Sequence, residues 1–215
     1  MQKIIPYKTV RDAHSALDNG GRFYNFLTAA DDGQIEASEL AKVAGVFTDQ
    51  QKMILYLDMA IGRLPPDEAS SVISALTEGL QAQYQVHRPN HFTPAQANQS
   101  GRAATSATVT GIPRHVQSSS DFTGFIMVPV TTGKMTTFVM VPMIDQYDVY
   151  EVCDVDTKDE FLIAHVRGVQ KLPQAVVTVG GILKELQGDK ESKPKHSLFL
   201  ESLYFVDVGV DDCTT

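Results

Sequence analysis

Three carboxylates, Asp32, Glu36 and Glu39, lie close together in one short polar stretch of the chain. Carboxylate oxygens are the ligands that calcium prefers in proteins. The stretch also contains Gly33 and falls between two segments whose apolar spacing predicts helices. These three residues are therefore the candidate metal ligands of the sequence.

The stretch 28–39 resembles the calcium-binding loop of EF-hand proteins. When Gly33 takes the place of the family's turn glycine, Asp32, Ile35 and Glu39 match loop positions five, eight and twelve. The first and third positions, where the family has carboxylates, hold a threonine and an alanine. The resemblance implies a weak calcium site.

A structural role is the alternative for the same stretch. Gly33 would then provide the turn, Ile35 would enter the core, and the acids would stabilise the start of the next helix. Helical domains of the tellurite-resistance type have a similar acidic corner.

The remaining residues with catalytic or metal-binding chemistry form no recognisable set. His87 and His91 are four residues apart, but Pro89 between them prevents a shared helical face. Cys153 and Cys213 are too far apart for a Cys-x-x-Cys site. No serine nucleophile motif, phosphate-binding loop or dinucleotide motif occurs. We therefore expect a protein that is not an enzyme and needs no cofactor.

A near repeat marks the centre of the second half. Residues 123–130 and 136–143 share five identities in eight positions, including a Met-Val-Pro run, and they flank a glycine-containing connection. This arrangement predicts a β-hairpin. Pro129 and Pro142 are expected where a strand bends, bulges or meets an edge, because proline cannot donate to a sheet. The apolar hairpin could mediate self-association.

The elements around these residues divide the chain in two. Apolar residues recur at helical spacing in the first half, at 11–27, 37–44, 49–62 and 67–86. Strand patterns follow at 107–112, 125–130, 136–152, 161–169, 175–186 and 197–206. The predicted fold class is α+β, with an N-terminal helical bundle followed by a C-terminal small antiparallel β-barrel. The predicted domains are a helical domain at 1–87, a linker at 88–106, a barrel at 107–208 and a disordered tail at 209–215.

Three runs in the second half, 165–168, 175–186 and 198–206, resemble the later strands of OB-fold domains. That family has a helix between its third and fourth strands, which 154–160 is too short to supply, so SH3-like and other small barrels stay open. The OB-fold resemblance implies a ligand surface on the second and third strands and the loops beside them. The candidate ligand-binding residues there are Phe125, Lys134, Phe138, Arg114, Arg167 and Lys171.

Charge argues against nucleic acid as the ligand. The chain has 18 basic and 26 acidic residues and a net charge of -8. Both halves are acidic, because the net charge is -3 over 1–89 and -5 over 90–215, so neither half is basic. No signal peptide or membrane span is apparent, and we expect a cytoplasmic protein.

The predicted function is therefore a non-catalytic binding or adaptor protein with a protein partner or a second copy of itself. Two alternatives stay open: single-stranded nucleic-acid binding by the barrel, and a weak response to calcium.

Overall fold

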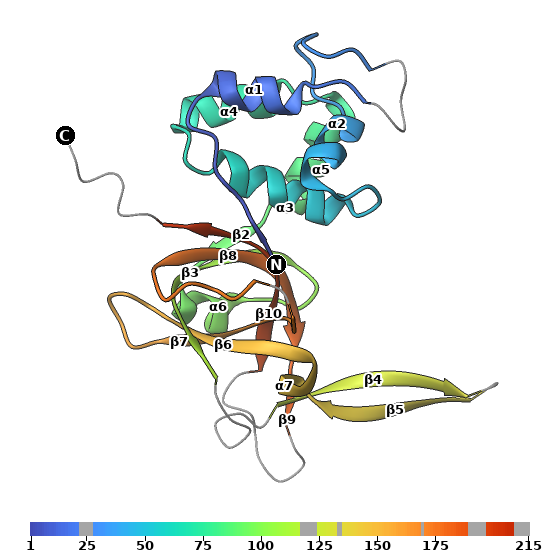
Figure 1. Cartoon of the computed structure of the whole chain (residues 1–215), viewed down its shortest axis with the longest axis vertical. Coiled ribbons are helices and arrows are strands. Elements are labelled where there is room, and N and C mark those ends of the chain that lie inside the picture. The colour runs from blue at the N-terminus through green and yellow to red at the C-terminus, as the bar shows by residue number, and fades with distance from the viewer. Residues whose placement is uncertain (22–27, 117–123, 133–134, 169, 189–196, 209–215) are drawn as a thin grey trace. The chain divides into compact units, whose positions relative to one another are not determined.

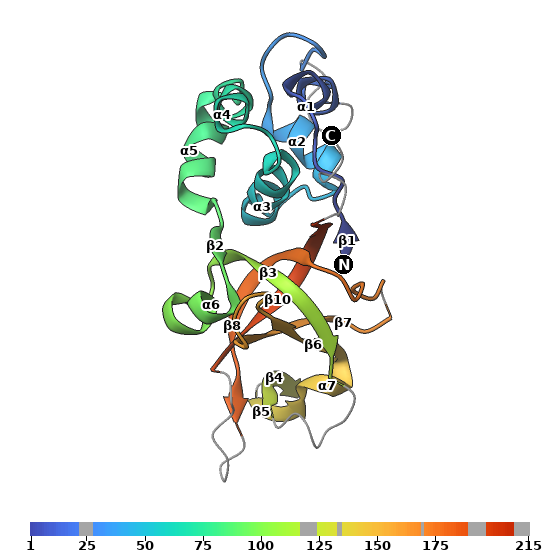
Figure 2. The same cartoon turned by 90° about the vertical axis from the view of Figure 1, so that its left-hand side faces the viewer.

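The computed structural model describes residues 1–21, 28–116, 124–132, 135–168, 170–188 and 197–208, with the backbone alone at 127–132, 135, 138 and 187–188. The described residues form two compact units. One unit covers Lys3–Asn90, and the other combines Met1–Gln2 with His91–Thr215. Figures 1 and 2 show the elements of both.

The unit at Lys3–Asn90 is helical. Its described helices are α1 (Val10–Leu17), α2 (Ala37–Ala44), α3 (Gln50–Ile61), α4 (Pro66–Ser74) and α5 (Glu78–His87). Helix α3 is the central one, because its residues from Met53 to Ile61 are all buried. The apolar side chains of α3 therefore form much of this unit's core.

The predicted helix at 67–86 is two helices. The backbone of Leu76 forms a parallel β-bridge with Ile35. The amide of Ile35 donates to the carbonyl of Ala75, and the carbonyl of Ile35 accepts from the amide of Thr77. Extended backbone at this point is incompatible with a continuous helix, so α4 ends before the bridge and α5 begins after it.

The other unit is built from strands. The larger of two sheets has seven strands: β1 (Gln2–Lys3), β2 (Asn90–Phe92), β3 (Ser106–His115), β6 (Tyr147–Cys153), β7 (Glu160–Val166), β8 (Val177–Glu185) and β10 (Leu198–Asp207). The smaller sheet has the order β5-β4-β9, with β4 at Gly124–Thr132, β5 at Met135–Pro142 and β9 at Gln187–Gly188. Two short helices, α6 (Pro94–Ser100) and α7 (Met143–Gln146), lie among these strands.

Five strands of the larger sheet pair in a closed circuit, called the strand ring below. Strand β3 pairs with β6 and β8, β6 pairs with β7, and β10 pairs with β7 and β8. All five strands contribute to one buried cluster, which includes Val109, Val152, Phe161, Val179 and Phe205. Because side chains alternate along a strand, this cluster is the interior of the ring.

The fold class predicted from the sequence is wrong. Among the described residues there are ten strands and seven short helices, and the helices do not form one N-terminal block. The larger sheet begins with β1, before the helices, and it is mixed because β10 runs parallel to β7. The stretch expected to be a linker contains β2 and α6.

The physical reason for the error is that periodicity describes one segment at a time. A strand of two or three residues has no period to detect, and periodicity does not show which distant strands pair. None of the helices in the described ranges has the length and apolar character needed to cross a membrane.

Candidate functional site

The β4–β5 hairpin is the apolar feature that the repeat predicted. Its two strands pair antiparallel from Phe125↔Pro142 to Thr132↔Met135, which confirms the predicted hairpin. Strand β9 pairs with β4 at Phe125 and Gly124, so β4 is the middle strand of this sheet. In Figure 1 the two strands run away from α7 as an arm. We call β4 and β5 together the hairpin arm.

Apolar side chains on both faces of β5 are exposed. Val139 is 45% exposed and its neighbour Met140 is 39% exposed. Successive side chains of a strand point to opposite faces, so neither face is covered at this place. At the base of the arm, Ile126 packs against a buried cluster that includes Met143, so the arm is attached by its base and exposed further out.

The two prolines of the arm have the same relation to the ladder. Opposite residues of an antiparallel ladder alternate between two classes, hydrogen-bonded pairs and non-hydrogen-bonded pairs. Pro129 pairs with Phe138 and Pro142 pairs with Phe125, and these two pairs belong to the same class. Because a proline has no N–H to donate, this class is the one whose backbone groups point away from the partner strand. On β5 the amides of Phe138 and Met140 therefore face the outer edge.

A second apolar cluster covers the outside of the strand ring. Met143 of α7 is buried together with Val149 of β6, Leu162 and Ala164 of β7, and Phe199 of β10. These residues alternate with those of the ring interior, so they lie on the opposite face of the same strands. The outer surface of β6 and β7 is thus partly occupied by this chain's own α7.

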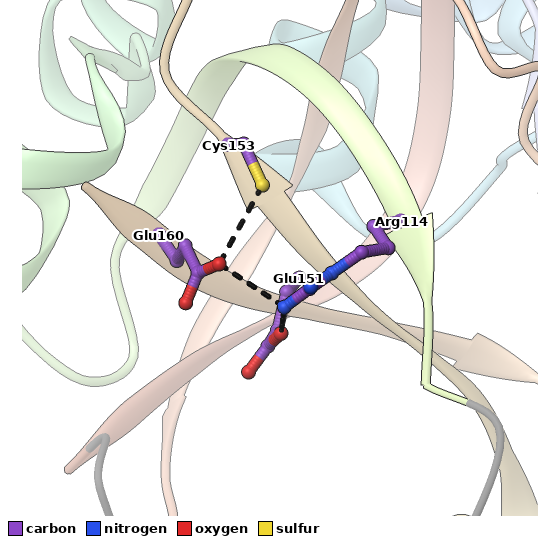
Figure 3. A network of polar contacts seen from close by, with 4 residues as sticks. All are labelled: Arg114, Glu151, Cys153 and Glu160. Atoms are coloured by element: carbon purple, nitrogen blue, oxygen red, sulfur yellow. Dashed lines mark hydrogen bonds and ion pairs between the residues drawn. The ribbon is translucent and has the colours of Figure 1, made fainter. Parts of the chain in front are cut away.

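Further along the same strands, Arg114 is held in a polar network that Figure 3 shows. Arg114 lies opposite Glu151 in the β3–β6 register and forms ion pairs with Glu151 and, at 3.1 Å, with Glu160. Its side chain is 64% exposed, and hydrogen bonding and charge from Glu151 raise its pKa. Two carboxylates for one guanidinium leave the network acidic, so Arg114 contributes no net positive surface.

Cys153 belongs to the same network. Its Sγ lies 3.8 Å from Glu160, and burial and then the charge of Glu160 raise the pKa of the thiol. Since the thiolate is the reactive form of cysteine, a raised pKa makes Cys153 a poor nucleophile near neutral pH.

The other predicted ligand residues are not brought into one patch. The guanidinium of Arg167 donates to the carbonyl of Ile144 in α7 and lies 3.9 Å from Asp148. Lys171 is exposed between β7 and β8, and Phe125 is half-buried at the base of the arm. Lys134 and the side chain of Phe138 lie outside the described residues. No described contact joins Arg114, Arg167 and Lys171.

The acidic corner of the helical unit binds its own backbone. Glu39 is fully buried, and its carboxylate accepts hydrogen bonds from the amides of Gly20, at 2.5 Å, and Glu36, at 2.8 Å. Asp18 likewise accepts from the amides of Asp32 and Gly33. Burial raises the pKa of Glu39. The bonds of Glu39 connect the turn at Gly20 to the start of α2.

Metal ligation at this corner has no further support from the geometry. Of the predicted ligands, Glu36 accepts from the Thr28 hydroxyl, and Asp32 accepts from the amide of Gln34. Within the described ranges, no group of three or more His, Cys, Asp or Glu side chains is arranged to hold a metal ion. Sequence reasoning missed Asp18, because its role depends on a contact across the turn that no local motif signals.

A buried histidine lies within the strand ring. His165 of β7 is 1% exposed, stacks on Tyr150 at a centroid distance of 5.6 Å, and places Nδ1 3.0 Å from the carbonyl of Val166. Its Nε2 is buried with no hydrogen-bond partner among the described residues. Burial lowers the pKa of His165.

Comparisons with known proteins add a weak likeness to a solved structure. No protein-family model and no curated protein matches the chain. Among solved structures, the chain is similar to a crystal structure of the N-terminal domain of an archaeal MCM. The two share 12% identity with a TM-score of 0.35, over 80% of this chain and 84% of that one. A likeness at this level carries no argument about the function of the chain.

Proposed function

We propose that the chain is a non-catalytic binding protein that contacts a protein partner through the hairpin arm. The observation that supports this most directly is the exposure of Val139 and Met140 on opposite faces of one strand. A strand that exposes apolar side chains on both faces has neither face packed against its own chain, so both faces are available to a partner. Methionine also adapts its shape to a partner at little cost.

The charge distribution supports the same surface. Between Asp121 and Asp145 the chain carries a single charged residue, Lys134, although its net charge is -8. A neutral, apolar partner could therefore approach the arm without meeting a carboxylate of residues 122–144.

A paired substitution tests this proposal. Val139→Lys places a charge on the arm, whereas Val155→Lys places the same charge at a residue that is 60% exposed in the turn after β6. We expect affinity purification of the tagged full chain from its native cells to retain its specific partners, untagged copies included, with Val155→Lys. Val139→Lys should lose them, because a charge at an interface core opposes desolvation.

The contrary result is equally clear in this experiment. If Val139→Lys and wild type retain the same proteins in the same amounts, the arm is not the contact surface and the proposal is wrong. Circular dichroism of each variant shows whether the fold is preserved.

Single-stranded nucleic-acid binding is the second candidate, and the order of pairing in the strand ring favours it. Numbered along the chain, the first ring strand pairs with the second and fourth, the second with the third, and the fifth with the third and fourth. This order resembles that of OB-fold domains, which often bind oligonucleotides. The acidic network around Arg114 and the net charge oppose it. Retention of a labelled oligonucleotide that falls as salt rises would favour this candidate over the first.

A further inference from the structure

The partner of the hairpin arm can be specified from the outer edge of β5. Strand β5 is the terminal strand of its sheet, with β4 on one side and no described strand on the other. The amides of Phe138 and Met140 face that outer edge, as the positions of the two prolines require. The edge is therefore able to accept a further strand.

Among the residues that the structure describes, strand β5 lacks the features that normally prevent edge pairing. Such features are charged side chains, prolines within the strand, bulges and covering elements. Residues 135–142 contain no charged residue, their one proline is the last residue, and the β4–β5 register is continuous. The exposed Val139 and Met140 show that neither face is covered at the middle of the strand. An edge of this kind pairs readily with a strand of matching character.

The charge of the hairpin arm determines which class of partner can bind its edge. A nucleic acid or an acidic peptide needs cations, and a basic peptide needs carboxylates, but 122–144 contains only Lys134. A second copy presents the same neutral edge, so pairing there brings together no carboxylates of residues 122–144 although each chain has a net charge of -8. The edge is thus electrostatically complementary to itself.

We infer that β5 pairs antiparallel with β5 of a second copy across a twofold axis. The two three-stranded sheets then join into one continuous sheet of six strands. Because outward-facing amides must pair with outward-facing amides, Val139 lies on the same face as its copy and within two residues of it. This inference rests on the proposed function and specifies its partner.

Two substitutions that introduce opposite charges at Val139 test the inference directly. We expect light scattering of wild type at about 100 micromolar to give twice the mass of the 23.5 kDa chain. Val139→Lys and Val139→Glu should each give the mass of one chain, because like charges then face each other across the axis. An equimolar mixture of the two variants should recover the double mass. Val155→Lys is the matched control and should remain dimeric.

A backbone substitution separates the edge from the hairpin itself. Met140→Pro removes an amide that faces outward, so the β4–β5 ladder is kept while pairing between copies is lost. Met140→Leu changes the side chain and keeps the amide, so the dimer should persist. Circular dichroism should show the same strand content for Met140→Pro as for wild type.

Different outcomes overturn different statements. A monomeric wild type, or a dimer that persists in both Val139→Lys and Met140→Pro, overturns the inference about a second copy. The wild type could instead be monomeric and capture a different protein that Val139→Lys does not capture. In that case the proposed function stands, and only the identity of the partner changes. If Val139→Lys and Met140→Pro each leave both the mass and the captured proteins unchanged, the inference and the proposed function are both wrong.

Discussion

At the scale of single residues, the two buried carboxylates of the acidic corner, Asp18 and Glu39, bind backbone amides. The Glu39 carboxylate accepts two amides, at Gly20 and Glu36, and so connects a turn to a helix. The spacing of Asp32, Glu36 and Glu39 could be recognised from the sequence, but their hydrogen-bond partners could not. Those partners depend on how a turn folds back on α2, which is a property of the tertiary structure.

His165 leads to a prediction about pH. Burial lowers the pKa of His165 in the folded state below its ordinary value of 6.5. Between the two values the unfolded chain binds more protons, so stability is complete above pH 6.5 and declines as the pH falls. His165→Phe keeps an aromatic ring on Tyr150 and removes the titration. Urea unfolding at a series of pH values should therefore show a shallower decline for the variant.

The control for this prediction is another histidine. His14→Gln, on α1 of the helical unit, should keep the wild-type pH dependence, because it leaves His165 unchanged. Equal slopes for wild type and His165→Phe would show that His165 does not contribute to the acid sensitivity.

At the scale of elements, the local signals were recovered well and the long-range pairings were not. Helix α6 begins with a capping box formed by Thr93 and Gln96, and α3 begins one residue later than expected, with Asp49 as its N-cap. Both features depend on neighbours within four residues. Helix α7, in contrast, has four residues and interrupts the long strand expected at 136–152. Its stability comes from Met143 in the buried cluster, which no local pattern reveals.

Close pairing of β8 with β10 gives a prediction about glycine. A Cβ on Gly181 would lie 2.1 Å from the carbonyl oxygen of Glu201, so backbone would have to move. We expect Gly181→Ala to lower the free energy of unfolding by more than about 2 kcal/mol. Thermal and urea unfolding of the purified variant measure this change.

Gly79 provides the matched control. It lies in α5, and a Cβ there would meet nothing within 4 Å. Gly79→Ala should raise the free energy of unfolding by about 0.5 to 1 kcal/mol, because alanine favours a helix. A destabilisation of similar size in both variants would argue against the close approach at Gly181.

At the scale of the whole molecule, acidity affects association. Each chain carries a net charge of -8, while the arm that we propose as the contact is almost free of charge. Salt screens the repulsion between two such chains and leaves apolar contacts in place. We expect self-association to strengthen between about 50 mM and about 500 mM salt, measured by sedimentation velocity. Weakening with salt would point to ion pairs or to nucleic acid.

The division of the chain explains which global features could be predicted. A change from helical to strand-rich spacing is visible in the sequence, but the predicted succession of a helical bundle and a barrel is wrong, because the larger sheet includes β1 ahead of the helices. The composition of the strand unit was not predictable, because Gln2 and Lys3 show no strand pattern and still form β1. The parallel pairing of β10 with β7 is also set by the packing of the ring and has no sequence signature.

The placement of β1 has a consequence for the connectivity of the chain. The strand unit begins with Met1 and Gln2, is interrupted by Lys3–Asn90, and resumes at His91. The helical unit is therefore an insertion, connected at both of its ends to the same sheet, through β1 and through β2. A fragment that starts at His91 would lack a strand that pairs with β10. Cutting the chain on one side of the helices would leave the helical unit connected to the sheet through only one of the two strands, β1 or β2.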